Sequence, residues 1–106
     1  MKNFQTKTSL DDTPNLLQPT TRVLAVNTAE TETIPAGALA VVITPILDDL
    51  YIANGSTPVV PVADLTDGSA PICIAKGASR IFKATPGTEI RMISTLANIV
   101  GVEYYN

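Results

Sequence analysis

The feature that most constrains this chain is how often its apolar runs are interrupted. From Arg22 to the C-terminus, short apolar runs alternate with Pro, Gly, Asn and Asp, and the chain contains eight prolines and six glycines. Their spacing is close to the roughly 8–12 residues typical of a sandwich or barrel. No segment keeps a 3.6-residue apolar period over several turns. We therefore expect an all-β fold, either a small antiparallel β-sandwich or a β-barrel.

The chain divides into two regions of different character. Residues 1–21 are polar and lack a sustained period, whereas residues 22–106 hold most of the apolar runs. We expect residues 1–21 to form an extended N-terminal arm and residues 22–106 to form one β domain, because 106 residues is a common size for a single domain.

The apolar runs also predict where the strands lie and which way their side chains face. The run at 38–45 is continuous and suits a central strand, whereas the strand at 30–34 is expected to be mostly exposed. The segment 57–62 contains Pro58 and Pro61 and belongs at an edge or an irregular margin. In the last run, Val100, Val102 and Tyr104 share one face of the strand. Strands are expected over 22–28, 30–34, 38–45, 50–53, 71–77, 79–85, 88–94 and 97–105.

Charge and hydropathy narrow the classes of partner. Ten acidic and seven basic residues give a net charge of −3, which disfavours nucleic acid as a partner because binding needs clustered Lys and Arg. No run approaches the ~18–20 apolar residues of a membrane span, and the N-terminus lacks the apolar stretch of a signal peptide. We expect no nucleic-acid and no membrane partner, and synthesis in a reducing cytoplasm.

The chain is poor in groups that carry out chemistry. It has no histidine and a single cysteine, Cys73, which excludes His-based catalysis and zinc sites built from His and Cys. Cys73 lies in an apolar strand without a basic neighbour, so we expect a buried structural thiol. The acidic pairs Asp48–Asp49 and Asp64–Asp67 are expected to form turns instead of a metal site. We expect no enzyme activity, no cofactor and no metal.

The C-terminal third carries a resemblance. The turn "PGT", the strand "EIRMIS", the hinge "TLA" and the last strand "NIVGVEYY" are similar to the closing hairpin of small tailed-bacteriophage virion proteins. Head decoration (capsid cement) proteins are the nearest group, and "ETIPAGALAVV" shares a weaker likeness. The resemblance implies a non-enzymatic protein of the virion, made in the host cytoplasm, that binds the major capsid protein as a homo-oligomer, with a trimer favoured.

Two hypotheses for function follow. In the first, the protein decorates or cements a phage capsid. The small number of charged residues and the apolar last strand support this hypothesis, because both suit a chain that packs among copies of itself. In the alternative, it is a receptor- or glycan-binding module of a phage tail or fibre, with Tyr51 and the loop Asp64–Ser69 at its tip. The residues expected to contact a partner are Phe4, Leu10, Leu16, Leu17, Tyr104 and Tyr105.

Overall fold

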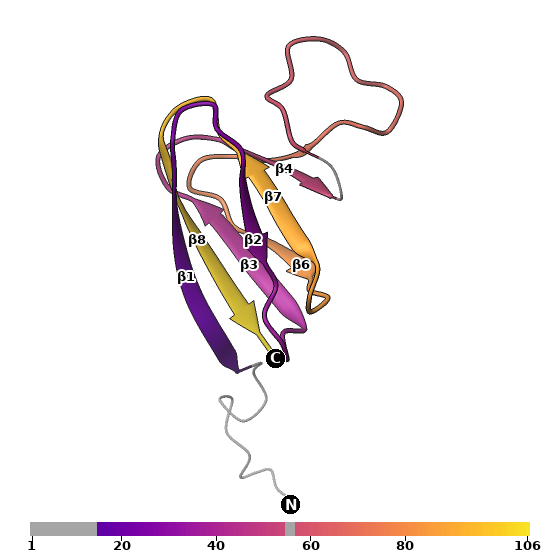
Figure 1. Cartoon of the computed structure of the whole chain (residues 1–106). Helices are drawn as coiled ribbons and strands as arrows, with labels where there is room; N and C mark the ends of the chain where they lie inside the picture. The colour runs from indigo at the N-terminus through magenta and orange to yellow at the C-terminus, as the bar shows by residue number, and fades with distance from the viewer. Residues whose placement is uncertain (1–14, 55–56) are drawn as a thin grey trace, which may run out of the picture.

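The computed structural model describes residues 15–54 and 57–106, and all regular structure within them is β. Eight strands form two four-stranded antiparallel sheets that pack together as a small β-sandwich (Figure 1). The all-β prediction is confirmed, and of the two architectures it left open the sandwich is the one observed. Sheet A has the order β1-β8-β3-β6 and sheet B the order β2-β7-β4-β5. The strands are β1 (Leu16–Leu24), β2 (Glu30–Thr33), β3 (Ala40–Pro45), β4 (Leu50–Asn54), β5 (Ile72–Ile74), β6 (Arg80–Lys83), β7 (Glu89–Ile93) and β8 (Asn98–Tyr105).

The first strand starts earlier than the sequence suggested. Residues 16–21, expected to belong to the arm, form the first part of β1 and pair with β8. The pairing extends one step further, because Asn15 and Asn106 exchange N–H···O bonds of 3.2 and 3.0 Å. The polar composition of residues 16–21 suits an edge strand, which has one neighbour and one solvated face and needs few apolar side chains. The β domain therefore includes Leu16 and the residues after it, and residues 1–14 are outside the described part of the chain.

Two tight turns join strands at one end of the sandwich. The first turn contains Pro35 and Gly37, and the second contains Pro86 and Gly87. The φ angles of the two glycines are 85° and 84°. This left-handed region is easily adopted only by glycine. Ile34, directly after β2, is hydrogen-bonded to the second turn: it donates its N–H to Thr88 O (2.9 Å) and accepts the N–H of Gly87 (3.0 Å).

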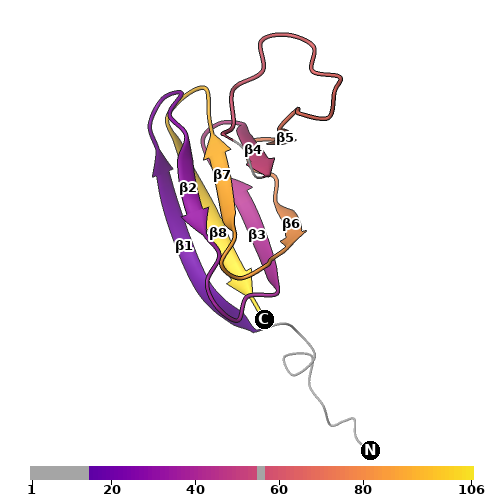
Figure 2. The ribbon, with the colours of Figure 1, turned by 45° about the vertical axis from the view of Figure 1, so that its right-hand side comes forward.

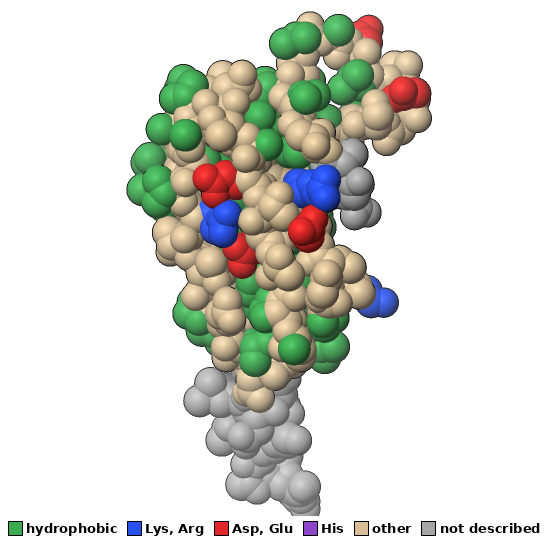
Figure 3. All heavy atoms as spheres, viewed as in Figure 1, with side chains coloured by type: hydrophobic (Ala, Val, Ile, Leu, Met, Phe, Trp, Pro, Cys, Tyr) green, Lys and Arg blue, Asp and Glu red, His purple; other side chains and the backbone are tan. Residues whose placement is uncertain are grey.

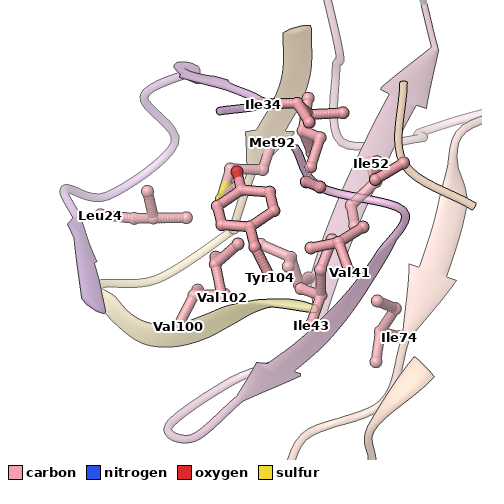
Figure 4. Packing of buried hydrophobic residues seen from close by; sticks show 14 residues of the cluster. Leu24, Ile34, Val41, Ile43, Ile52, Ile74, Met92, Val100, Val102 and Tyr104 are labelled. Carbon is pink, nitrogen blue, oxygen red and sulfur yellow. The ribbon is translucent and has the colours of Figure 1, made fainter. Parts of the chain in front are cut away.

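The core lies between the sheets and is almost entirely aliphatic, as Figure 4 shows. On β8, Val100, Val102 and Tyr104 are fully buried, which confirms the predicted facing of that strand. The continuous run at 38–45 forms β3, which lies between β8 and β6 and is central as predicted. Other buried side chains of the core come from both sheets and include Leu24, Val41, Ile43, Leu50, Ile52, Ile74, Ile90 and Met92.

A long irregular loop, residues 57–71, connects β4 to β5. It projects away from both sheets in the two views of Figures 1 and 2. The prediction that Pro58 and Pro61 keep this segment out of a central strand is confirmed. Val62, within this loop, is 97 % exposed. Figure 3 shows hydrophobic and acidic side chains together on the loop.

Candidate protein-binding surfaces

The residues predicted to contact a partner fall into two groups. Phe4 and Leu10 lie outside the described residues. Leu16 and Leu17, at the start of β1, are exposed by 51 % and 38 %. Tyr105 pairs with Leu16 across the sheet, is half-buried, and donates its hydroxyl to a Glu103 carboxylate oxygen at 3.1 Å. Leu16, Leu17 and Tyr105 thus lie together at one end of sheet A, although nothing in the structure shows a partner.

Tyr104 is a core residue. Its side chain is fully buried, because it shares the inward face of β8 with Val100 and Val102. Its hydroxyl donates to Oε2 of Glu32 at 3.1 Å. Burial, followed by the Glu32 carboxylate nearby, raises the pKa of Tyr104. In this conformation Tyr104 cannot contact a partner, which corrects its place among the predicted contact residues.

A partly buried ionic network joins the two sheets at Tyr104. Nη1 of Arg22, on β1, lies 3.0 Å from Oε1 of Glu32, on β2, and its Nη2 lies 2.7 Å from Glu30. The expectation of a mostly exposed strand at 30–34 is wrong for Glu32, which is only 7 % exposed. Glu32 lies on the same face as Ile34 and therefore points into the sandwich. A buried carboxylate requires such a partner, so Arg22 allows a charged residue to occupy this inward position.

The outer face of sheet A combines exposed apolar side chains with few charges. Val23 on β1 and Ile81 on β6 are each 70 % exposed, and Ile99 on β8 is 38 % exposed. The strand registers place outward-facing residues of the four strands in adjacent rows. Glu103 and Lys83 are the only charged members. The face comprises Pro19, Thr21, Val23, Ala40, Val42, Thr44, Ile81, Lys83, Ile99, Gly101, Glu103 and Tyr105.

The opposite end of the sandwich is fastened by Asn98, a residue that the sequence did not single out. Asn98 is 1 % exposed. Its Oδ1 accepts the N–H groups of Leu47 (3.0 Å), Asp48 (3.2 Å) and Ile99 (2.9 Å). Its Nδ2 donates to Asp48 O (2.8 Å) and to Ser94 Oγ (2.7 Å). One amide side chain thus satisfies the backbone of the β3–β4 turn and joins it to β8.

Three of the four acidic residues, Asp48, Asp49 and Asp67, bind loop backbone, and Asp67 does so within its own turn, as predicted. Asp48 accepts the N–H of Leu96 (3.2 Å), Asp49 that of Lys76 (2.9 Å), and Asp67 that of Ser69 (3.0 Å). Within residues 15–54 and 57–106, no cluster of three or more acidic or cysteine side chains could hold a metal ion. Their hydrogen bonds are those of side chains that stabilise turns.

Cys73 does not occupy the buried position expected of it. It lies on β5 with its side chain on the outer face of sheet B, and it is exposed. Its neighbours Ile72 and Ile74 take the inward positions, so the expected burial of Cys73 is wrong. Partial burial and the charge of Asp49 raise the pKa of the Cys73 thiol. The raised pKa lowers the fraction of the thiol that is present as thiolate, the form that acts as a nucleophile.

A groove opens on the side of the sandwich where β6 is the edge of sheet A. It has a volume of about 290 Å³. Its floor consists of aliphatic core residues, and its rim includes Lys83, Thr85, Thr88 and Glu89. Phe82 lines it from β6, and the Cζ atom of Arg80 lies 5.6 Å from the centroid of that ring. The aliphatic lining residues are Ile34, Val41, Ile43, Ile52, Ala53, Ile72 and Ile90.

No known protein family, no curated protein and no solved structure matches this chain. Within the described part of the chain, no helix is long and apolar enough to cross a membrane. Evidence on function therefore comes from the surfaces: an apolar outer face on sheet A, a projecting loop and a side groove.

Proposed function

We propose that this protein is a non-enzymatic structural component of a tailed-phage virion that decorates or cements the capsid by binding the shell as an oligomer. The observation that carries the proposal is the outer face of sheet A. An exposed β-sheet face with Val23, Ile81 and Ile99 and only two charged residues is suited to contact with protein. The particular assembly, a virion shell, is proposed from the resemblance of the C-terminal hairpin.

The size of this face agrees with a contact repeated many times. Four strands about 4.8 Å apart, with rows from Val23 to Lys83 spanning about 20 Å, give a footprint of roughly 400 Å². A single stable interface usually buries about 800 Å² on each partner. One such contact is therefore weak by itself. A lattice that engages many copies at once would raise the overall affinity without any larger contact.

Substitutions on the face test the proposal. Val23→Asp together with Ile81→Asp places two charges on the apolar surface of sheet A without touching the core, since both side chains are 70 % exposed. We expect this variant to fold and to lose co-sedimentation with purified shells of the phage that encodes it. Thr31→Asp with Thr33→Asp, on exposed positions of β2 in sheet B, is the matched control. Equal shell binding by both variants would remove the sheet A face from the mechanism.

The arm is tested by deletion. Because β1 begins at Leu16, a deletion that leaves sheet A intact ends at Pro14. We expect the variant lacking residues 1–14 to keep its far-ultraviolet circular dichroism and to bind shells more weakly. Undiminished shell binding would exclude the arm from the contact.

A second candidate function is favoured by the projecting loop. The loop 57–71 extends beyond the sheets (Figure 2), and it contains the segment Asp64–Ser69 expected at a recognition tip. Such a position suits a receptor- or glycan-binding module of a tail or fibre. Replacing Val62 and Leu65 by Ser discriminates between the two functions: shell binding that survives this change supports the sheet A face, whereas a glycan-array signal that it abolishes supports the recognition module.

A further inference from the structure

The side groove is an apolar opening with the dimensions of a binding site. Its volume of about 290 Å³ is roughly twice that of a ~150 Å³ cavity that binds benzene. It can therefore accept one or two aliphatic side chains. We propose that this groove binds the N-terminal segment around Leu10, Asp11 and Asp12 of a second copy of the chain.

The charges around the groove favour an acidic ligand. On β6, Arg80 lies over the ring of Phe82, and Lys83, the residue after Phe82, belongs to the rim. Within residues 15–54 and 57–106, neither basic group is in an ion pair. Glu89, the acidic residue of the rim, is already paired with Arg91 at 2.8 Å. The groove thus offers an apolar interior beside unpaired positive charge.

The sequence before β1 contains the complementary pattern. Leu10 is followed directly by Asp11 and Asp12, which places an aliphatic side chain next to two carboxylates. Leu10 would enter the apolar interior, and the carboxylates would face Arg80 and Lys83. Pairs of this kind fix the register of a peptide in its site more than they add affinity.

The edge of β6 offers backbone groups to an extended peptide. Ala84 donates its N–H to Leu39 on the β3 side (3.0 Å). Residues alternate along an antiparallel strand, so Phe82 and Arg80 also direct their backbone groups toward β3. The N–H and C=O groups of Ile81 and Lys83 consequently face away from sheet A. A bound segment can pair with them as an added strand, a common mode of peptide recognition.

Geometry favours the groove of another copy. Leu16 and Lys83 lie in one row across sheet A, through Tyr105 and Ala40, and are three strand spacings apart, about 14 Å. Leu16 is the first residue of β1, at this end of sheet A. Pro14 disfavours helical backbone at the residue before it, so the chain would have to reverse within a few residues to reach its own groove. Fully extended, the segment from Leu10 to Leu16 spans at most about 20 Å.

A segment donated from one copy to the next is a head-to-tail contact. Such contacts close into rings when the rotation between copies permits, which agrees with the homo-oligomer that we propose for shell binding. The inference rests on that proposed function and names the contact that would hold the copies together before they reach a shell.

Disulfide trapping between copies tests this contact directly. In a Cys73→Ser background, one full-length chain carries Asp11→Cys and a second, of distinguishable mass, carries Thr85→Cys at the groove rim. We expect the mixed chains to form a disulfide-linked pair at least tenfold faster than when Thr33→Cys, on the exposed face of β2, replaces Thr85→Cys. Equal rates would overturn the proposal. So would a chain carrying both substitutions that links only within itself.

Charge exchange provides an independent test by light scattering without shells. Arg80→Glu with Lys83→Glu is expected to weaken self-association about tenfold, and mixing with chains carrying Asp11→Lys and Asp12→Lys is expected to restore it. Lys76→Glu, an exposed charge reversal in another turn, is the control. A mixture that fails to recover association overturns the inference. Shell binding by the sheet A variants is measured separately, so failure here and failure of the proposed function are distinguishable.

Discussion

Replacing Asn98 tests how much of the fold depends on one buried amide. Asn98→Ala removes five hydrogen bonds, three accepted by Oδ1 and two donated by Nδ2. At about 1 kcal/mol net for each bond, the upper limit of the loss is ~5 kcal/mol. The N–H groups of Leu47 and Asp48 lie in a surface turn and can regain water. We therefore expect the free energy of unfolding to fall by about 3 kcal/mol, which lowers Tm by roughly 12–24 °C for a domain of this size.

The assay is equilibrium unfolding in urea followed by far-ultraviolet circular dichroism, with two companion variants. Ser94→Ala removes the hydroxyl that links Asn98 to Asp49 O and is expected to lose about 1 kcal/mol. Thr95→Ala changes an exposed side chain of the same turn and is expected to stay within about 0.5 kcal/mol of the parent. If Asn98→Ala and Thr95→Ala unfold at the same urea concentration, the amide does not stabilise this end of the sandwich and the reasoning fails.

Three further predictions concern single residues. Because burial and the Glu32 carboxylate raise the pKa of Tyr104 above its ordinary 10.0, the folded state holds this proton more tightly than the unfolded chain does. Its contribution to the free energy of unfolding is complete below about pH 10 and is lost as the pH rises above it, by up to ~1.4 kcal/mol per pH unit. Between about pH 9 and pH 11, the free energy of unfolding in urea should therefore fall less steeply with pH for Tyr104→Phe than for the parent. An equal dependence on pH would contradict the burial argument. Gly87→Ala is expected to cost about 1 kcal/mol through its φ of 84° alone, because a Cβ there meets no atom within 4 Å. Gly101→Ala, with ordinary φ and only a 3.8 Å contact, should be tolerated, and equal losses in thermal melts would show that φ is not the cause. Cys73 is expected to react with iodoacetamide in the native protein. Below the raised pKa of the thiol, the rate should increase about tenfold for each unit by which the pH is raised. A reaction that needs denaturant would show that the thiol is buried.

The sequence predicted best those features that depend on neighbours along the chain. The facing of Val100, Val102 and Tyr104, the turn at Gly87 and the irregular segment around Pro58 all follow from local alternation and backbone preference. The start of β1 was missed because an edge strand needs few apolar residues. Its pairing partner, β8, lies at the far end of the chain.

The errors at single sites have a common origin. Alternation shows which residues share a face but not which face is covered. The strand at 30–34 was expected to be mostly exposed and the burial of Glu32 was missed, because only the arrival of Arg22 and Tyr104 from sheet A makes an inward carboxylate tolerable. For Cys73 the reverse occurred: an apolar local sequence suggested burial, and the outer face of sheet B is open at that point. Even the groove, built by residues from six segments, has no signal within any one of them.

The distribution of polar and apolar residues bears on how the protein works. Single exposed apolar side chains are normal on any protein, so Val23 or Ile81 alone would indicate nothing. On sheet A, however, the strand registers place Val23 beside Ile99 and Ile81 beside Val42, with the row Thr21–Gly101–Thr44 between the two pairs. Together they lie on one face of roughly 400 Å², a size at which apolar patches are often functional. Meanwhile Glu32 occupies a buried position that an aliphatic residue could fill. A monomer selected only for its own stability would gain from the opposite arrangement, with aliphatic residues inside and charges outside. The arrangement observed is favourable if the apolar face of sheet A becomes buried against protein in an assembly, while the buried polar groups hold the two sheets in register beneath it.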